Sequence, residues 1–191
     1  MRLQNKSLVM VRLNEFIEVY EDALQPNTCK TLIDIFENNK DKQERIENDK
    51  KPNFTQFNFT KNLTKDYEKI HNQVIKTVLS YKEKYYTMID PRVFPSENTF
   101  EQFRIKKYSD KNDLFDTHVD VKDHESSRRF LAFMFYLNDV ECGGETIFHE
   151  KKVIPKTGTL LVFPPLWMFP HRGEPPLKGS KYIMSTYLHY K

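Results

Sequence analysis

The stretch Phe130-Leu131-Ala132-Phe133-Met134-Phe135-Tyr136-Leu137 decides the fold, because it is an unbroken run of apolar and aromatic residues. A strand with one solvated face alternates apolar and polar residues, whereas a strand covered on both faces reads as a continuous apolar run. We therefore expect residues 129–138 to form a strand in the middle of a β-sheet.

More strands are expected on both sides of this stretch along the chain. Segments rich in β-branched and aromatic residues are separated there by turns of Pro, Gly, Asn and charged residues. Phe57 and Phe59, two residues apart, indicate a further short strand. The other expected strands cover residues 16–20, 100–108, 152–154, 159–163 and 182–190.

The first half of the chain favours helices. One helix should open near Pro26, because proline suits the first helical turn, and it should bury Leu32 and Phe36. A second helix is predicted over residues 65–87, where apolar residues step by three and four. These residues are Tyr67, Ile70, Val74, Val78, Tyr81 and Tyr85.

Helices followed by many strands predict an α+β fold, in which N-terminal α-helices back a double-stranded β-helix (jelly-roll) core. A length of 191 residues fits one domain. Within that single domain, residues 1–98 would be mainly helical support and residues 99–191 would form the core.

The composition excludes some classes of function. The chain has 30 basic and 27 acidic residues, a net charge of +3, which predicts no nucleic-acid and no membrane partner. The Lys-rich run 40–51 also holds acidic residues, so a solvated loop is favoured over a phosphate site. Cys29 and Cys142 provide neither a disulfide framework nor a zinc spacing. The sequence has no secretory signal and no membrane-spanning run, so we expect a cytoplasmic protein.

His118-Val119-Asp120 is the most informative motif for function. Along an extended segment, residues 118 and 120 lie on the same face and Val119 points away. A second imidazole would complete a two-histidine, one-carboxylate set, which binds non-haem Fe(II) on one side and leaves positions open. The sequence offers five candidates for that imidazole, and on the residues alone both His149 and His171 stay open. The full set is His71, His124, His149, His171 and His189.

A series of motifs over residues 100–190 resembles the 2-oxoglutarate- and Fe(II)-dependent dioxygenases, most closely their prolyl 4-hydroxylase branch. The motifs follow the family's order, and jointly they are much more specific than any one of them. They are Tyr108, Phe115, His118-Val119-Asp120, Arg129, Tyr136-Leu137-Asn138, Gly143-Gly144-Glu145-Thr146, Phe148, Gly158 to Pro164, His171-Arg172-Gly173, Gly179 and Lys181.

The resemblance implies both a metal site and a cosubstrate site. His118, Asp120 and His171 would be the metal ligands and the catalytic centre. Lys181, ten residues after His171, would pair with the far carboxylate of 2-oxoglutarate as a point charge. By the same resemblance, the hydroxyl groups of Tyr108 and Tyr136 would contact the cosubstrate. The other expected requirements are O2 and stimulation by ascorbate.

The resemblance also implies an activity and a set of substrate contacts. Peptidyl proline would be hydroxylated while 2-oxoglutarate is decarboxylated to succinate and CO2, so a proline-containing peptide or protein is the expected partner. Arg129 would contact the substrate, with Arg128 as an equal rival. Tyr187, where the family usually carries tryptophan, and Trp167 would line the substrate channel.

Two other functions remain as alternatives at this point. The chain could hydroxylate a free amino acid or another small molecule with the same iron chemistry. It could also be a non-catalytic jelly-roll binding module, although the retained ligands and anchor oppose that reading. The sequence does not predict the oligomeric state.

Overall fold

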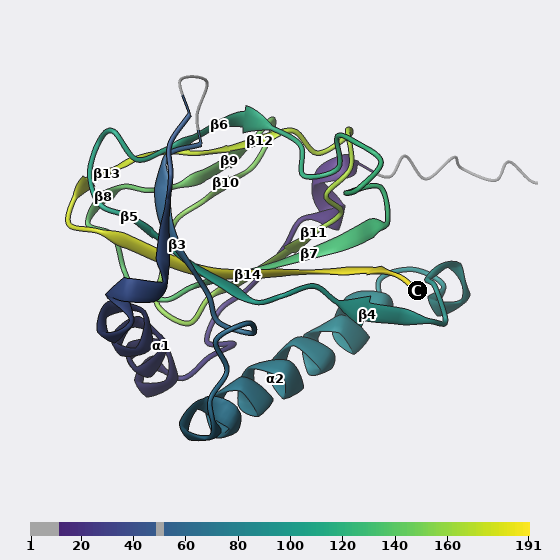
Figure 1. Cartoon of the computed structure of the whole chain (residues 1–191). Coiled ribbons are helices and arrows are strands. Elements are labelled where there is room, and N and C mark those ends of the chain that lie inside the picture. The colour runs from purple at the N-terminus through teal and green to yellow at the C-terminus, as the bar shows by residue number, and fades with distance from the viewer. Residues whose placement is uncertain (1–11, 49–51) are drawn as a thin grey trace, which may run out of the picture.

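A computed structural model describes residues 12–48 and 52–191 of the chain. Its largest element is a sheet of eight strands, in which β4 pairs with β14 beside the main path. Figure 1 shows this sheet across the middle of the molecule. In spatial order its strands are β1 (Glu18–Tyr20), β11 (Leu160–Phe163), β7 (Arg129–Tyr136), β14 (Lys181–Tyr190), β5 (Arg104–Tyr108), β3 (Phe54–Asn58) and β2 (Gln43–Ile46), with β4 (Asn98–Phe100).

A smaller sheet faces one side of the large one. Its four strands run in the order β10 (Lys152–Val153), β9 (Thr146–Phe148), β12 (His171–Gly173) and β6 (Phe115–His118). A separate two-stranded pair joins β13 (Pro176–Lys178) to β8 (Cys142–Gly143). The strand pairs of the two larger sheets are antiparallel. The predicted α+β fold with a jelly-roll core is confirmed.

Two helices cover the other side of the large sheet, α1 (Pro26–Asn38) and α2 (Glu68–Tyr86). The helix predicted over residues 65–87 is confirmed, although it opens with the 3-10 turn η3 (Lys65–Tyr67). Pro26 stands in the first turn of α1 as predicted, where its missing N–H is not needed. The remaining 3-10 turns are η1 (Leu13–Phe16), η2 (Lys40–Lys42) and η4 (Pro91–Val93).

The strand expected in the middle of a sheet is β7, which pairs with β11 on one side and β14 on the other. Its alternate residues pack into two different cores. Phe133 and Phe135 belong to the core under the helices, whereas Ala132 and Tyr136 belong to the core between the two sheets. Both faces are covered, which is why the sequence is apolar at every position.

The N-terminal part of the chain contributes strands as well as helices. Strands β1, β2 and β3 all extend the large sheet. The Lys-rich run predicted as a loop contains β2, which pairs with β3 along Gln43–Ile46; residues 49–51 of that run lie outside the described part. An edge strand needs little apolar sequence, because polar side chains can face solvent on it.

Candidate metal centre

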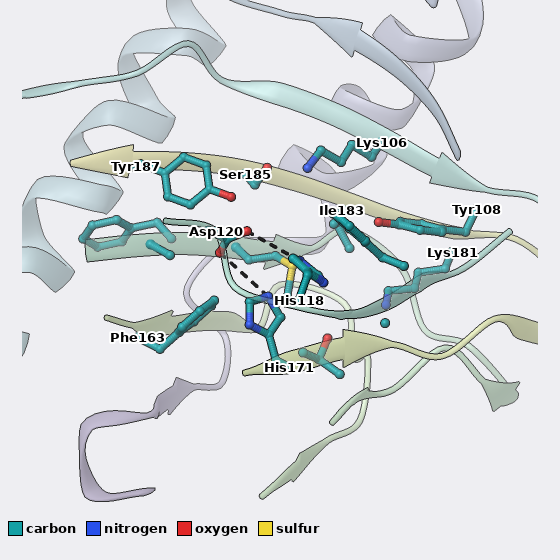
Figure 2. A pocket seen from close by; sticks show the side chains of 16 residues that line it. Lys106, Tyr108, His118, Asp120, Phe163, His171, Lys181, Ile183, Ser185 and Tyr187 are labelled. Atoms are coloured by element: carbon teal, nitrogen blue, oxygen red, sulfur yellow. Dashed lines mark ion pairs between the residues drawn. The ribbon is translucent and has the colours of Figure 1, made fainter. Parts of the chain in front are cut away.

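His118, Asp120 and His171 come together between the two sheets. His118 ends β6 and His171 begins β12, and these two residues lie opposite each other in the antiparallel pair. Asp120 follows His118 by two residues, and its carboxylate faces both rings (Figure 2). One ligand atom from each of the three residues lies within 4.8 Å of the others. The structure thus brings together the three residues that the resemblance selected.

The other histidines do not join this group. Among residues 12–48 and 52–191, these three side chains form the only set of three metal-ligating groups. His71 lies in α2, and its ring packs edge-on against Phe59 and Phe103, so it belongs to the core under the helices. The choice that the residues left open between His149 and His171 therefore falls on His171 by geometry.

Backbone carbonyls orient the two imidazole rings. His118 Nδ1 lies 2.7 Å from the Asp116 carbonyl oxygen, and His171 Nδ1 lies 3.1 Å from that of Phe169. A carbonyl only accepts hydrogen bonds, so Nδ1 carries the proton in each neutral ring and Nε2 keeps its lone pair. Metal-ligating histidines are commonly held in this way.

Both free Nε2 atoms face the Asp120 carboxylate. The His118 Nε2 to Oδ1 distance is 3.5 Å, and the His171 Nε2 to Oδ2 distance is 3.7 Å. Good hydrogen bonds between nitrogen and oxygen are shorter than this. The two imidazole lone pairs and the carboxylate therefore point to a common space without forming good hydrogen bonds to one another. This arrangement suits a divalent metal ion bound by all three groups.

The protonation states also fit metal binding. Burial alone would raise the pKa of Asp120, but the contact with His118 and the positive charge of its neighbours lower the pKa to about 2. Burial lowers the pKa of His171. An ionised carboxylate and a neutral imidazole are the forms that ligate a metal.

Aromatic rings hold the ligands in place. The Phe115 ring stacks on His118 with centroids 3.5 Å apart and planes at 8°. His171 contacts the rings of Phe148 and Phe163 at 5.3 Å and 4.9 Å. These contacts leave each imidazole little freedom to turn away from Asp120.

Lys181 occupies the same cavity as the three ligands. The cavity has a volume of about 50 Å³ and is partly open to solvent. Lys181 is only 2% exposed, and its Nζ lies 5.2 Å from the Tyr108 ring centroid and 5.6 Å from that of Tyr136. No described residue accepts a hydrogen bond from this ammonium or forms an ion pair with it. Burial lowers the pKa of Lys181 to about 7, against the opposing charges of Glu145 and Glu174. A buried ammonium without an anion fits the far carboxylate of a dicarboxylic acid.

The two predicted tyrosines differ in position. Tyr108 lines the cavity opposite Lys181 in the β5–β14 register. Tyr136 lies behind the cavity wall, where its hydroxyl and that of Thr146 are 2.7 Å apart. Thr146, which lines the cavity, was not singled out from the sequence. A direct contact of Tyr136 with the cosubstrate stays a prediction.

The predicted substrate residues are spread more widely than expected. Tyr187 lines the cavity beside Asp120. Arg129 is outside the cavity lining: it donates to the Glu101 carboxylate at 2.6 Å and 3.0 Å and to the Asp120 carbonyl at 3.0 Å, and it lies 4.3 Å from the Tyr187 ring centroid. Arg129 therefore positions Asp120 and Tyr187, and substrate contact by it stays a prediction.

Arg128 and Trp167 also lie away from the three ligands. The rival Arg128 is exposed. Trp167 is 77% exposed and borders a different hollow together with Met168 and Phe169, so it is not part of the cavity that holds the ligands. Its role as a substrate contact stays a prediction.

Lys106 is the functional candidate that the sequence reading missed. It lies in the cavity lining on β5, two residues before Tyr108. Alternation along a strand puts these two residues on the same face, so the spacing from Tyr108 was a signal that could have found it.

Two antiparallel sheets with a two-histidine, one-carboxylate cluster between them define a jelly-roll protein with a candidate metal centre. The sequence profile of the 2OG-Fe(II) oxygenase superfamily matches residues 103–189, which include the three ligands and Lys181. Over these residues the chain is similar to this superfamily, which is named for Fe(II) and 2-oxoglutarate, and the proteins that it resembles are prolyl 4-hydroxylases.

Curated relatives include the prolyl 4-hydroxylase subunit alpha-1 of Homo sapiens, which is 24% identical over 163 residues, 73% of this chain. The subunit alpha-1 of Bos taurus matches over the same share at the same identity. The chain spans 30% of the length of these relatives. Within its described part, no helix is long and apolar enough to cross a membrane.

Solved structures show the same fold. The 2OG complex of the viral collagen prolyl hydroxylase vCPH from Paramecium Bursaria Chlorella virus-1 has a TM-score of 0.71 and 21% identity, with 92% of this chain and 97% of that chain covered. A Pseudomonas putida prolyl-4-hydroxylase has a TM-score of 0.71 and 14% identity, over 92% and 93%. A Trichoplax adhaerens prolyl hydroxylase with a hypoxia inducible factor peptide fragment has a TM-score of 0.69 and 14% identity, over 91% and 83%.

Proposed function

We propose that the chain is an Fe(II)- and 2-oxoglutarate-dependent dioxygenase that hydroxylates a prolyl residue in a peptide or protein. One observation carries the proposal: the unpaired, buried ammonium of Lys181 shares a cavity with three convergent metal ligands. A dicarboxylic keto acid can satisfy both at once, with its keto acid end at the metal and its far carboxylate at Lys181.

Each residue then has a defined task. His118, Asp120 and His171 hold the ferrous ion, and the carbonyls of Asp116 and Phe169 keep both imidazoles in the ligating tautomer. Lys181 fixes the orientation of 2-oxoglutarate by neutralising its far carboxylate. Tyr108 and Thr146 offer hydroxyl groups from the cavity wall, the latter beside the Tyr136 hydroxyl.

The surrounding residues protect the chemistry. When bound, the ferrous ion lets O2 oxidise 2-oxoglutarate to succinate and CO2 and hydroxylate a C–H bond, with ascorbate as a stimulating reductant. Phe115, Phe148 and Phe163 surround the ligating imidazoles with aromatic carbon and limit the access of water. Arg129 holds the Asp120 backbone through a hydrogen bond to its carbonyl.

Two comparisons support a peptidyl proline substrate. The curated relatives are prolyl 4-hydroxylase subunits, and one structural neighbour of the same fold was solved with a peptide fragment bound. The cavity is partly open to solvent, as a peptide substrate requires. Hydroxylation of a free amino acid or another small molecule is the alternative, and it would use the same metal and cosubstrate residues.

A peptide assay tests the proposed substrate. With Fe(II), 2-oxoglutarate, ascorbate and O2, proline-rich peptides should stimulate succinate formation and gain the mass of one oxygen atom on proline. The matched control replaces each proline of the peptide by alanine, which should leave succinate at the background rate. Stimulation by free proline alone would favour the small-molecule alternative, and stimulation by no proline compound would contradict the proposal.

A further inference from the structure

Lys106 brings a second ammonium group into the cavity. It lies opposite Ile183 in the register of β5 and β14, and Ile183, Ser185 and Tyr187 all line the cavity from β14. Figure 2 shows the Lys106 side chain directed toward the Ser185 and Tyr187 end of this strand, whereas Lys181 lies at the other end. The cavity therefore holds two cations, Lys181 opposite Tyr108 and Lys106 nearer to Ser185.

Lys106 has no anionic partner of its own. No described residue forms a hydrogen bond or an ion pair with its Nζ, which lies 5.1 Å from the Phe54 ring centroid. Arg129, a further cation on that side, is already neutralised by Glu101. Lys106 is half-buried, so solvent provides only part of the stabilisation that its charge requires.

The remaining charged groups around Lys106 do not supply a partner. Arg104, on the same face of β5, adds positive charge and donates to Gln102, with no carboxylate partner in the described chain. On the neighbouring strand β3, Gln56 lies opposite Lys106 and donates to Glu44 at 2.8 Å, so that carboxylate bonds elsewhere. Asp120 is the carboxylate that attracts Lys106.

Filling the metal site removes even that attraction. A divalent ion would take up the charge of Asp120, and the two carboxylates of 2-oxoglutarate would be used by the ion and by Lys181. Lys106 would then be the uncompensated charge of the cavity. Before the metal binds, burial lowers the pKa of Lys106 to about 8, against the attraction of Asp120, so the group is mostly protonated at neutral pH. In the filled site an anionic substrate group would supply the attraction that Asp120 no longer gives.

We propose that Lys106 binds a carboxylate of the substrate, so that the site selects substrates with an anionic group beside the carbon to be hydroxylated. The inference rests on the proposed function and narrows its substrate class. The carboxylate has two possible sources, an acidic residue next to the target proline or the free α-carboxylate of an amino acid. Both present the same chemistry to the ammonium.

Binding without turnover tests the inference apart from the chemistry. Without O2, and with Mn(II) and 2-oxoglutarate bound, affinities are measured for paired peptides that carry Glu or Gln beside proline. A second pair, free proline and prolinamide, separates the two sources of carboxylate. In at least one of these pairs, the wild type should bind the acid with roughly tenfold or more higher affinity than the amide, as expected for a charge-assisted hydrogen bond.

Variants on the two faces of β5 give matched comparisons. Lys106→Met should remove the preference for acids but leave the affinity for the neutral amide ligands unchanged. Lys106→Arg should keep the preference for acids. Lys106→Glu should instead favour peptides with Lys beside proline. Lys107→Met is the control, because Lys107 faces α1 and pairs with Glu37 at 2.7 Å. It should behave as the wild type.

The outcomes separate this inference from the proposed function. Equal affinity of the wild type for acids and amides, or a preference that survives in Lys106→Met, overturns the inference while prolyl hydroxylation stands. Lys106-dependent binding of acids without any proline hydroxylation supports the inference and sinks the prolyl function. Binding of no acid at all overturns the inference.

Discussion

Lys181→Met is expected to weaken 2-oxoglutarate binding strongly and, in the same protein, to raise the stability of the metal-free fold. Removal of one partner of a buried charge pair costs about 2–5 kcal/mol, so affinity for the cosubstrate should fall by at least roughly thirtyfold. In the free protein the ammonium is 2% exposed and has no anion. Replacing a buried ionic group by an apolar side chain of similar size often stabilises, by about 1–4 kcal/mol. Isothermal titration with 2-oxoglutarate and urea unfolding measure the two effects.

The pH dependence of unfolding isolates the contribution of Lys181. Its pKa in the fold is about 7, below the ordinary 10.5, so between these values the unfolded chain binds the extra proton. The free energy of unfolding should therefore rise with pH in this window, by at most about 1.4 kcal/mol per pH unit for one group. Below pH 7 the buried Lys181 ammonium destabilises the fold to its full extent. The wild type should show this rise and Lys181→Met should lose it.

Cosubstrate affinity should follow the opposite trend with pH. Only the ammonium form of Lys181 pairs with a carboxylate, so affinity for 2-oxoglutarate should fall as the pH rises above about 7. Lys107→Met, which removes a lysine from the other face of the sheet, should keep the affinity of the wild type. Unchanged 2-oxoglutarate affinity in Lys181→Met would contradict the anchor role.

Asp120→Ala is expected to lose both metal binding and turnover. The substitution removes the only anionic ligand of the candidate centre, within the described residues, and leaves two neutral imidazoles. Metal affinity should fall by more than the roughly 10- to 100-fold that follows loss of an outer partner of a metal ligand. Equilibrium dialysis with Fe(II) under anaerobic conditions measures the loss, and succinate formation should drop to background.

Asp116→Ala is the matched control for that substitution. Asp116 is an exposed carboxylate four residues away, and it holds His118 through its backbone carbonyl, which alanine retains. Metal binding should therefore survive the loss of the Asp116 side chain. Equal metal affinity in Asp120→Ala and the wild type would exclude Asp120 as a ligand.

Local sequence patterns predicted the parts of the fold that depend on local physics. The unbroken apolar run marked β7 as a central strand, and the three-and-four spacing marked α2. Strand β2 was not predicted, because an edge strand with solvated side chains has no apolar pattern. Its pairing with β3 is a contact that only the folded structure shows. Polar edge strands are therefore the weakest part of such a prediction.

The site was only partly predictable, because its parts come from distant segments. Alternation placed His118 and Asp120 on one face, but the third ligand depends on the register of β6 with β12, which no local pattern contains. The resemblance supplied His171 instead. Arg129 was expected at the substrate, yet the Glu101 carboxylate, 28 residues away in sequence, occupies its guanidinium. The spacing of residues along the sequence does not predict long-range ion pairs of this kind.

Anaerobic titration of the protein with Fe(II) and 2-oxoglutarate is the most direct test of the metal and cosubstrate site. Chelation of a ferrous ion by a keto acid gives a weak metal-to-ligand charge-transfer band in the visible spectrum. The band should appear in the wild type only when both components are present, and it should be absent in Asp120→Ala and His171→Ala. A wild-type protein that binds both components and shows no band would contradict the proposed dioxygenase site.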